Sequence, residues 1–109
     1  MKIHVKFSVN NMLNKQGVVS AWIHYENGNK LILTADNGAY TTPDKQVAVA
    51  DRFSPTYVNS TYNDFVLFLP YNAIPNLGKG SHNLKFCVGI HHGSNQIATS
   101  EFQDFTISW

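Results

Sequence analysis

The chain has 109 residues, a length that suits one domain of the usual size of about 100 to 150 residues. Hydrophobic residues make up 43% of it, which excludes an intrinsically disordered chain. The formal net charge is only +1, so there is no basic surface of the kind that binds nucleic acid or an anionic membrane.

The two ends and the single cysteine bear on how the domain is used. No apolar run approaches the roughly 20 residues of a membrane-spanning helix, and an alternating segment stands where the core of a signal peptide would lie. The chain stops inside another alternating segment. We therefore expect residues 1–109 to be one domain excised from a longer chain, without membrane insertion. Cys87 cannot form an internal disulfide, which leaves the redox compartment open.

The N-terminal half shows the two-residue alternation of half-buried strands. Residues 3–9 place apolar side chains at every odd position, and residues 18–25 repeat the pattern with Trp22 on the opposite face. Asn27-Gly28 follows and predicts a type I′ hairpin turn, so residues 30–35 should return antiparallel. A second such pair, Asn37-Gly38, comes soon after.

The C-terminal half continues as strands separated by turns. Residues 46–53 alternate, whereas residues 64–69 are almost wholly apolar, which predicts a central strand covered on both faces. A crossover loop with at most one short helical turn should follow Pro70. Residues 83–91 then alternate, Gly93-Ser94-Asn95 predicts a hairpin that returns through Ile97, and residues 105–109 form the last alternation.

These patterns predict an all-β protein. No segment repeats apolar residues at helical spacing, and seven or eight strands at spacings of about 8 to 12 residues are typical of an antiparallel β-sandwich. Immunoglobulin-like, fibronectin-like and C2-like arrangements all fit this pattern. The first strand and the last one could leave edges that flanking chain protects, or that pair with another copy by β-augmentation.

Three segments carry a resemblance to a known kind of domain. KIHVKFSVNNM at residues 2–12, YNDFVLFLPY at 62–71 and HNLKF at 82–86 resemble β-sandwich accessory domains attached to multidomain bacterial proteins. The resemblance implies an appended, non-catalytic module. Residues 54–69 are similar in layout to the middle of C2 domains, but residues 91–95 hold no carboxylate. A calcium-dependent C2 domain is therefore disfavoured, because Ca²⁺ takes six to eight oxygen ligands.

The residue types that carry chemistry form no recognisable site. His91 and His92 are adjacent, so on a strand they point to opposite faces and cannot easily bind one ion. Cys87 lies within a predicted strand with no sign of the helix N-terminus or fixed histidine that activates a thiol, which favours a structural role. The remaining histidines are interpreted as solvent-facing: His4, His24 and His82. We expect no catalytic residue, no metal site and no cofactor.

Aromatic residues are the best candidates for contacts with a ligand or partner: Trp22, Tyr57, Tyr62 and Tyr71. The three tyrosines lie in or beside the loops around residues 65–69, and core or corner roles are open to all four. The leading hypothesis is a non-catalytic module that binds a partner protein or a neighbouring domain. The alternative is a carbohydrate-binding module in which these rings stack on sugars.

Overall fold

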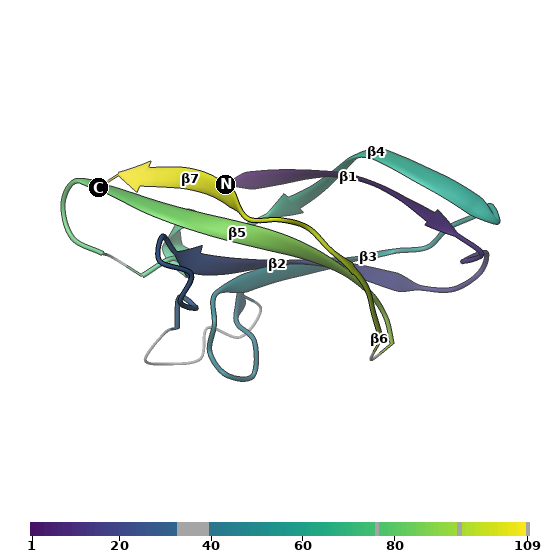
Figure 1. Ribbon diagram of the computed structural model, residues 1–109, viewed down its shortest axis with the longest axis horizontal. Coiled ribbons are helices and arrows are strands. Elements are labelled where there is room, and N and C mark those ends of the chain that lie inside the picture. Colours follow the sequence, from purple (N-terminus) through teal and green to yellow (C-terminus); the bar gives the residue numbers. More distant parts are fainter. Residues whose placement is uncertain (33–39, 76, 94, 109) are drawn as a thin grey trace.

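The computed structural model describes residues 1–32, 40–75, 77–93 and 95–108, and antiparallel strands dominate it (Figure 1). These residues form seven strands and a 3-10 turn: β1 Lys2–Asn10, β2 Gly17–Tyr25, β3 Ala48–Phe53, β4 Asn59–Phe68, η2 Tyr71–Ala73, β5 Ser81–His92, β6 Asn95–Thr99 and β7 Gln103–Ser108. The prediction of an all-β protein is confirmed, as is the short helical turn after Pro70. Ser94, which belongs to the predicted hairpin, lies outside the described residues, and so does Trp109.

The strands form two antiparallel sheets. β1 pairs with β4, and the larger sheet has the order β3-β2-β5 with β6 and β7 beyond β5. β2 pairs with residues 84–91 of β5, while β6 and β7 pair with two different stretches of the same strand. Both therefore lie along the edge of β5 that β2 leaves free, one after the other.

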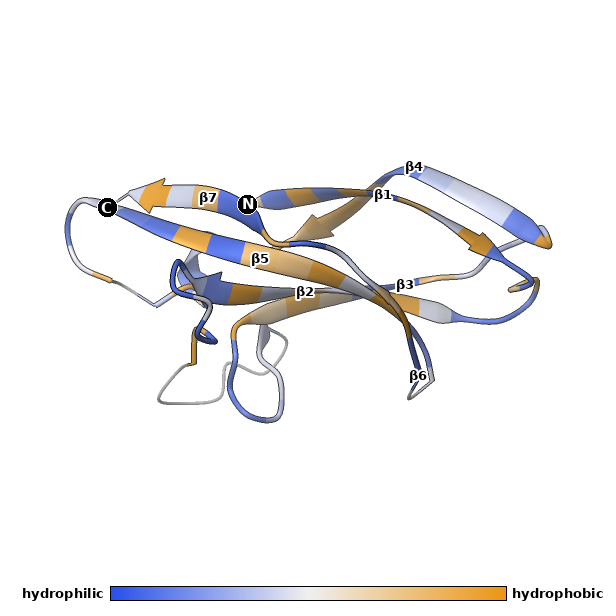
Figure 2. Ribbon diagram, in the orientation of Figure 1, coloured by the Kyte–Doolittle hydropathy of each residue, from blue (hydrophilic) through white to orange (hydrophobic). Residues whose placement is uncertain are grey.

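Residues from both sheets share one hydrophobic core, whose burial is the main favourable term in folding. Alternation along each strand selects them, and Figure 2 shows the hydrophobic and hydrophilic bands that alternate along β5. The smaller sheet contributes Ile3, Val9 and Leu67, and the larger sheet contributes Val19, Ala21, Ile23, Leu84 and Ile107.

The strand that contains residues 64–69 differs from its prediction. β4 begins five residues earlier, at Asn59, and in the described part of the chain it pairs with β1 alone. Leu67 is 1% exposed, but its neighbours Val66 and Phe68 are 38% and 54% exposed. The prediction of a strand covered on both faces is wrong, because a short apolar run cannot reveal which alternate residues meet solvent.

The antiparallel return after β2 is confirmed at residues 30–31, but the turn differs from the predicted one, and residues 33–35 lie outside the described residues. The Gly28 N–H donates to the Tyr25 carbonyl at 2.9 Å, and the Tyr25 N–H donates to the Asn29 carbonyl at 2.8 Å. Within residues 25–29, only Gly28 has a positive φ, +92°, whereas a type I′ turn needs positive φ at both of its central residues. Gly28 therefore follows an ordinary turn as a bulge residue. Asn37-Gly38 lies outside the described residues.

Candidate binding groove

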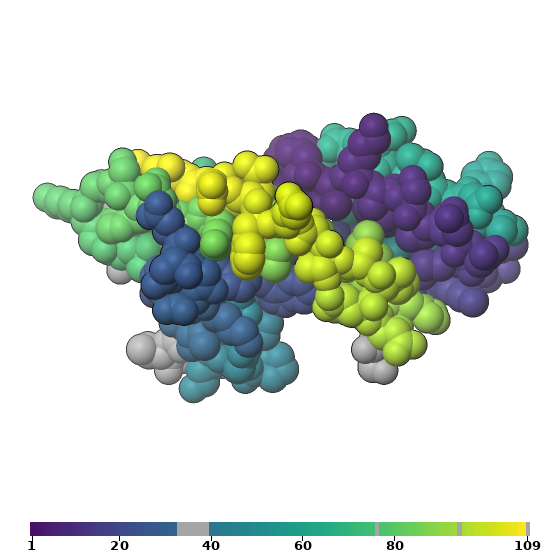
Figure 3. Space-filling model, in the orientation of Figure 1, coloured from purple at the N-terminus to yellow at the C-terminus, as the bar shows by residue number. Residues whose placement is uncertain are grey.

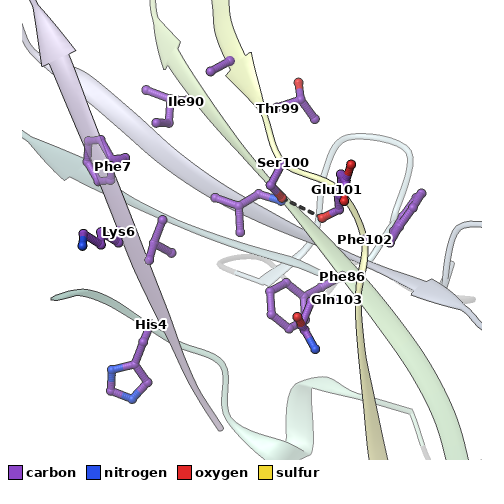
Figure 4. Close-up of a pocket in the computed structure, with 13 residues that line it drawn as sticks. His4, Lys6, Phe7, Phe86, Ile90, Thr99, Ser100, Glu101, Phe102 and Gln103 are labelled. Atoms are coloured by element: carbon purple, nitrogen blue, oxygen red, sulfur yellow. Dashed lines mark hydrogen bonds between the residues drawn. The ribbon is translucent and has the colours of Figure 1, made fainter. Parts of the chain in front are cut away.

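A groove of about 490 Å³ opens between β1 and the segment that carries β6 and β7 (Figure 4). Its floor is apolar, formed by Phe86, Val88 and Ile90 of β5, and Val5 and Phe7 line it from β1. In Figure 3 the N-terminal strand (purple) and the C-terminal segment (yellow-green) lie side by side on one face of the molecule. The groove is thus the side of the core that the two-stranded sheet leaves uncovered.

Ser100 builds the lip opposite β1. Its backbone N–H donates to the Val88 carbonyl at 2.7 Å, and its Oγ accepts the Val88 N–H at 2.8 Å while donating to the Glu101 carbonyl. A serine side chain thereby replaces a backbone carbonyl in the ladder. Pairing with β5 continues across the break between β6 and β7, and residues 100–102, which lie between the two strands, line the groove.

Phe102 marks the outer side of this lip. Its ring packs edge-on against His24, with centroids 4.9 Å apart, and the Lys85 Nζ lies 4.3 Å from its centroid. Such a cation over a ring is worth about 0.5 to 1 kcal/mol at an exposed site. About half of the Phe102 side chain nevertheless remains exposed. Because His24 and Lys85 lie on the outer face of the larger sheet, opposite Phe86, the ring points away from the floor of the groove (Figure 4).

Phe7, which lines the groove, belongs to a cluster of four aromatic rings. Phe7 of β1 stacks on Tyr62 at 4.8 Å and meets Phe53 and Phe65 edge-on at 5.1 Å and 5.8 Å. The cluster joins β1, β3 and β4, and aromatic pairs of this kind add about 0.5 to 1.5 kcal/mol each beyond their buried area. Tyr62 therefore lies in a strand within an aromatic cluster, not in a loop.

The four aromatic residues singled out in the sequence do not converge. Trp22 lies half-buried on the outer face of β2, edge-on to His91 at 5.4 Å. Tyr57 and Tyr71 are 72% and 65% exposed, but they flank opposite ends of β4, whose 10 residues span about 33 Å. None of the four lines the groove. The groove residues were predicted only as apolar positions of strands.

His24 lies in a hydrogen-bonded, partly buried site that changes its pKa. Its Nδ1–H donates to the Trp22 carbonyl, 3.2 Å away, which leaves Nε2 to accept from the Gln46 amide at 3.4 Å. The Gln46 amide also donates to the Ile23 carbonyl. Burial lowers the pKa of His24, and the nearby charges of Lys85 and Lys30 lower it further. The neutral imidazole is thus the form that this network accommodates.

The other candidates for chemistry lie apart from one another. His4 Nδ1 lies 2.6 Å from an Asp64 carboxylate oxygen, and the His92 ring bonds the Gln16 carbonyl. Burial raises the pKa of the Cys87 thiol, which keeps it protonated and unreactive at neutral pH. Over residues 1–32, 40–75, 77–93 and 95–108, no three His, Cys, Asp or Glu side chains gather closely enough to hold a metal ion.

No protein-family model matches this chain, and neither a curated protein nor a solved structure matches it. Among the residues that the structure describes, no helix is long and apolar enough to cross a membrane.

Proposed function

We propose that this chain is a non-catalytic β-sandwich module, of the immunoglobulin-, fibronectin- or C2-like class, that binds another polypeptide. The partner is a separate protein or a neighbouring domain of the same chain. The observation that carries the proposal is the groove between β1 and residues 100–103, where the core has an apolar floor and an open side.

The distribution of residue types around the groove supports this role. Protein interfaces usually have an apolar, aromatic centre surrounded by a polar rim. Here Phe86 and Val88 form the floor, and Lys6, Glu101 and Gln103 stand at the margin.

Photo-crosslinking tests whether a polypeptide occupies this surface. We would place p-benzoylphenylalanine at Gln103, an exposed residue that lines the groove beside Phe86. The matched control is Tyr71, an exposed position that does not line the groove. In cells of the source organism, we expect the Gln103 position to give one discrete adduct that Tyr71 does not give. The adduct should disappear when Ala98, an exposed residue of the groove wall, is changed to Arg. Adducts of equal yield from both positions would contradict binding at the groove.

Carbohydrate binding is a second candidate, and the exposed rings of Tyr57 and Tyr71 favour it. A ligand that binds only the folded state raises the melting temperature. A thermal-shift panel of glycans on the whole chain should show a rise with one glycan class that Tyr57→Ala or Tyr71→Ala removes, if this candidate holds. A flat panel combined with the Gln103 adduct would favour the polypeptide-binding module.

A further inference from the structure

Within residues 1–32, 40–75, 77–93 and 95–108, β1 pairs with β4 alone, so the backbone groups on its other edge have no strand partner there. Met1 and Leu69 exchange two hydrogen bonds of 2.8 Å, and at the other end the Asn11 N–H donates to the Val58 carbonyl at 2.6 Å. In an antiparallel ladder, residues that bond the partner strand alternate with residues whose N–H and C=O point away. Counting from either end, the odd residues of β1 bond β4 and the even residues, from Lys2 to Asn10, face the open edge.

This edge is also positively charged. Lys2, His4 and Lys6 follow one another along the outward side of β1, and both lysines are exposed. His4 contacts Asp64, whereas no ion pair involves Lys2 or Lys6 among the residues that the structure describes. A strand added here would place its own outward side chains about 5 Å from these cations.

The charge pattern argues against a second copy of this chain as the occupant. Two copies of β1 can pair over their full length with antiparallel register, Lys2 of one against Asn10 of the other. That register sets the two Lys6 side chains directly opposite each other, and directly opposed like charges destabilise a strand pair. Opposite charges at the same positions stabilise the pair. The edge therefore suits a different strand, one that carries acidic residues.

We propose that β1 binds an extended segment of a partner polypeptide as an added antiparallel strand, with acidic residues beside Lys2 and Lys6 and apolar residues between them. This inference rests on the proposed polypeptide-binding function. The apolar side chains would enter the groove over Val5 and Phe86, where the core is open. Glu101 lies on the opposite lip of the groove, where it would repel an acidic side chain. The acidic residues of the partner therefore belong on the β1 side alone. Main-chain hydrogen bonds would supply affinity and the alternating side chains specificity.

Two synthetic probes test the charge rule directly. Both have nine residues, the length of β1, with valine at every second position. At the remaining positions, one probe carries threonine in its N-terminal half and glutamate in its C-terminal half. When this probe pairs antiparallel with β1, its glutamates lie opposite Lys6, His4 and Lys2. The other carries lysine in place of glutamate. By fluorescence anisotropy, we expect the glutamate probe to bind at least about tenfold more tightly, and less tightly as salt rises.

Charge reversal in the protein should invert this preference. The double variant Lys2→Glu with Lys6→Glu should bind the lysine probe better than the glutamate probe. Lys15→Glu with Lys79→Glu is the matched control, because both of these exposed lysines lie in loops that do not line the groove. This control should keep the wild-type preference. Far-UV circular dichroism of each variant shows that its strands are intact.

A second pair of variants tests the hydrogen bonds of the edge. His4→Pro and His4→Ala both lose the contact with Asp64, but only proline removes an N–H that faces the open edge. We expect His4→Pro to weaken binding of the glutamate probe several-fold more than His4→Ala. The charge-reversed variants still decide the proposal if His4→Pro does not fold.

Three results would overturn the added strand: no saturable binding of the glutamate probe, equal binding of both probes, or a preference that charge reversal leaves unchanged. Each of these differs from failure of the proposed function. If the Gln103 adduct forms while the probes fail, the module binds polypeptides in another way. If the probes bind as expected but no adduct forms, β1 can bind an added strand, and the proposal that the groove binds a polypeptide in the cell is contradicted.

Discussion

Gly89 gives the sharpest test of how the outer face of the larger sheet is packed. It lies within β5, and a Cβ built on it would stand 2.5 Å from Cη2 and 2.6 Å from Cζ3 of Trp22. Real Cβ atoms do not approach other heavy atoms so closely, so the indole must move in Gly89→Ala. Inserting a methyl group into a packed site typically costs about 1 to 3 kcal/mol.

The same substitution should stabilise the protein once the indole is removed. Glycine within a strand is worse than alanine by about 0.5 to 1 kcal/mol, because it loses more conformational freedom on folding. In a Trp22→Ala background the methyl group still meets His91 Nε2 at 3.2 Å, but a shift of a few tenths of an ångström by that half-buried ring makes room for it. We therefore expect Gly89→Ala to lower the free energy of unfolding by about 0.5 to 2 kcal/mol in the wild type and to raise it by about 0.5 to 1 kcal/mol in Trp22→Ala.

Urea denaturation followed by far-UV circular dichroism measures all four proteins of this double-mutant cycle without relying on tryptophan fluorescence. The coupling free energy should then be about 1 to 3 kcal/mol. If Gly89→Ala has the same effect in both backgrounds, Trp22 does not pack on Gly89 and the reasoning fails.

Three further predictions concern individual side chains. Leu67→Ala should lower the free energy of unfolding by about 2 to 5 kcal/mol and Val66→Ala by about 0.5 kcal/mol or less, since only Leu67 is buried, and chemical denaturation compares them. The pKa of folded His24 lies below 6.5, so the unfolded chain binds this proton first and stability should fall as the pH drops through 6.5. The melting temperature of His24→Gln should fall less over the same interval, and an equal fall would contradict the assignment. The Cys87 thiol should react with a disulfide reagent at pH 8 several-fold more slowly in the folded protein than in urea, and equal rates would exclude its burial.

Alternation was enough to find most strands. β1, β2 and β5 lie within two residues of their predicted bounds, because each alternates apolar and polar residues over most of its length. β4 was harder to predict. Residues 59–64 contain a single aromatic side chain, Tyr62, among polar ones, and residues 65–68 are apolar on both faces, so neither stretch shows the period of two.

The turn after β2 shows a different limit. Asn-Gly predicts positive φ angles, but the type of turn also depends on which residues the flanking strands pair. Here the bond between the Tyr25 N–H and the Asn29 carbonyl closes the loop one residue wider than a type I′ turn allows. Gly28 then takes the positive φ alone. A hairpin was thus predictable, and its geometry was not.

The groove depends on contacts that alternation cannot reveal. Phe86, Val88 and Ile90 were predicted as one apolar face, but the groove above them follows from a smaller sheet of two strands. The pairing of β1 with β4 joins residues about 60 positions apart, such as His4 and Asp64. No local pattern encodes a pairing at that distance, so sequence alone could not tell which side of the core stays open.

One signal for the lip is nevertheless present in the sequence. The apolar alternation that runs through Ile97 is interrupted at Ser100 and Glu101, before it resumes at Phe105. Serine is one of the few residues whose side chain can accept the backbone N–H that the interruption would otherwise leave without a partner. Ser100→Ala should therefore leave the Val88 N–H unsatisfied at the edge of the groove, at a cost of about 1 to 3 kcal/mol. Ser100→Thr, which keeps the hydroxyl, should cost less in urea denaturation, and equal losses would mean that the hydroxyl does not hold the lip.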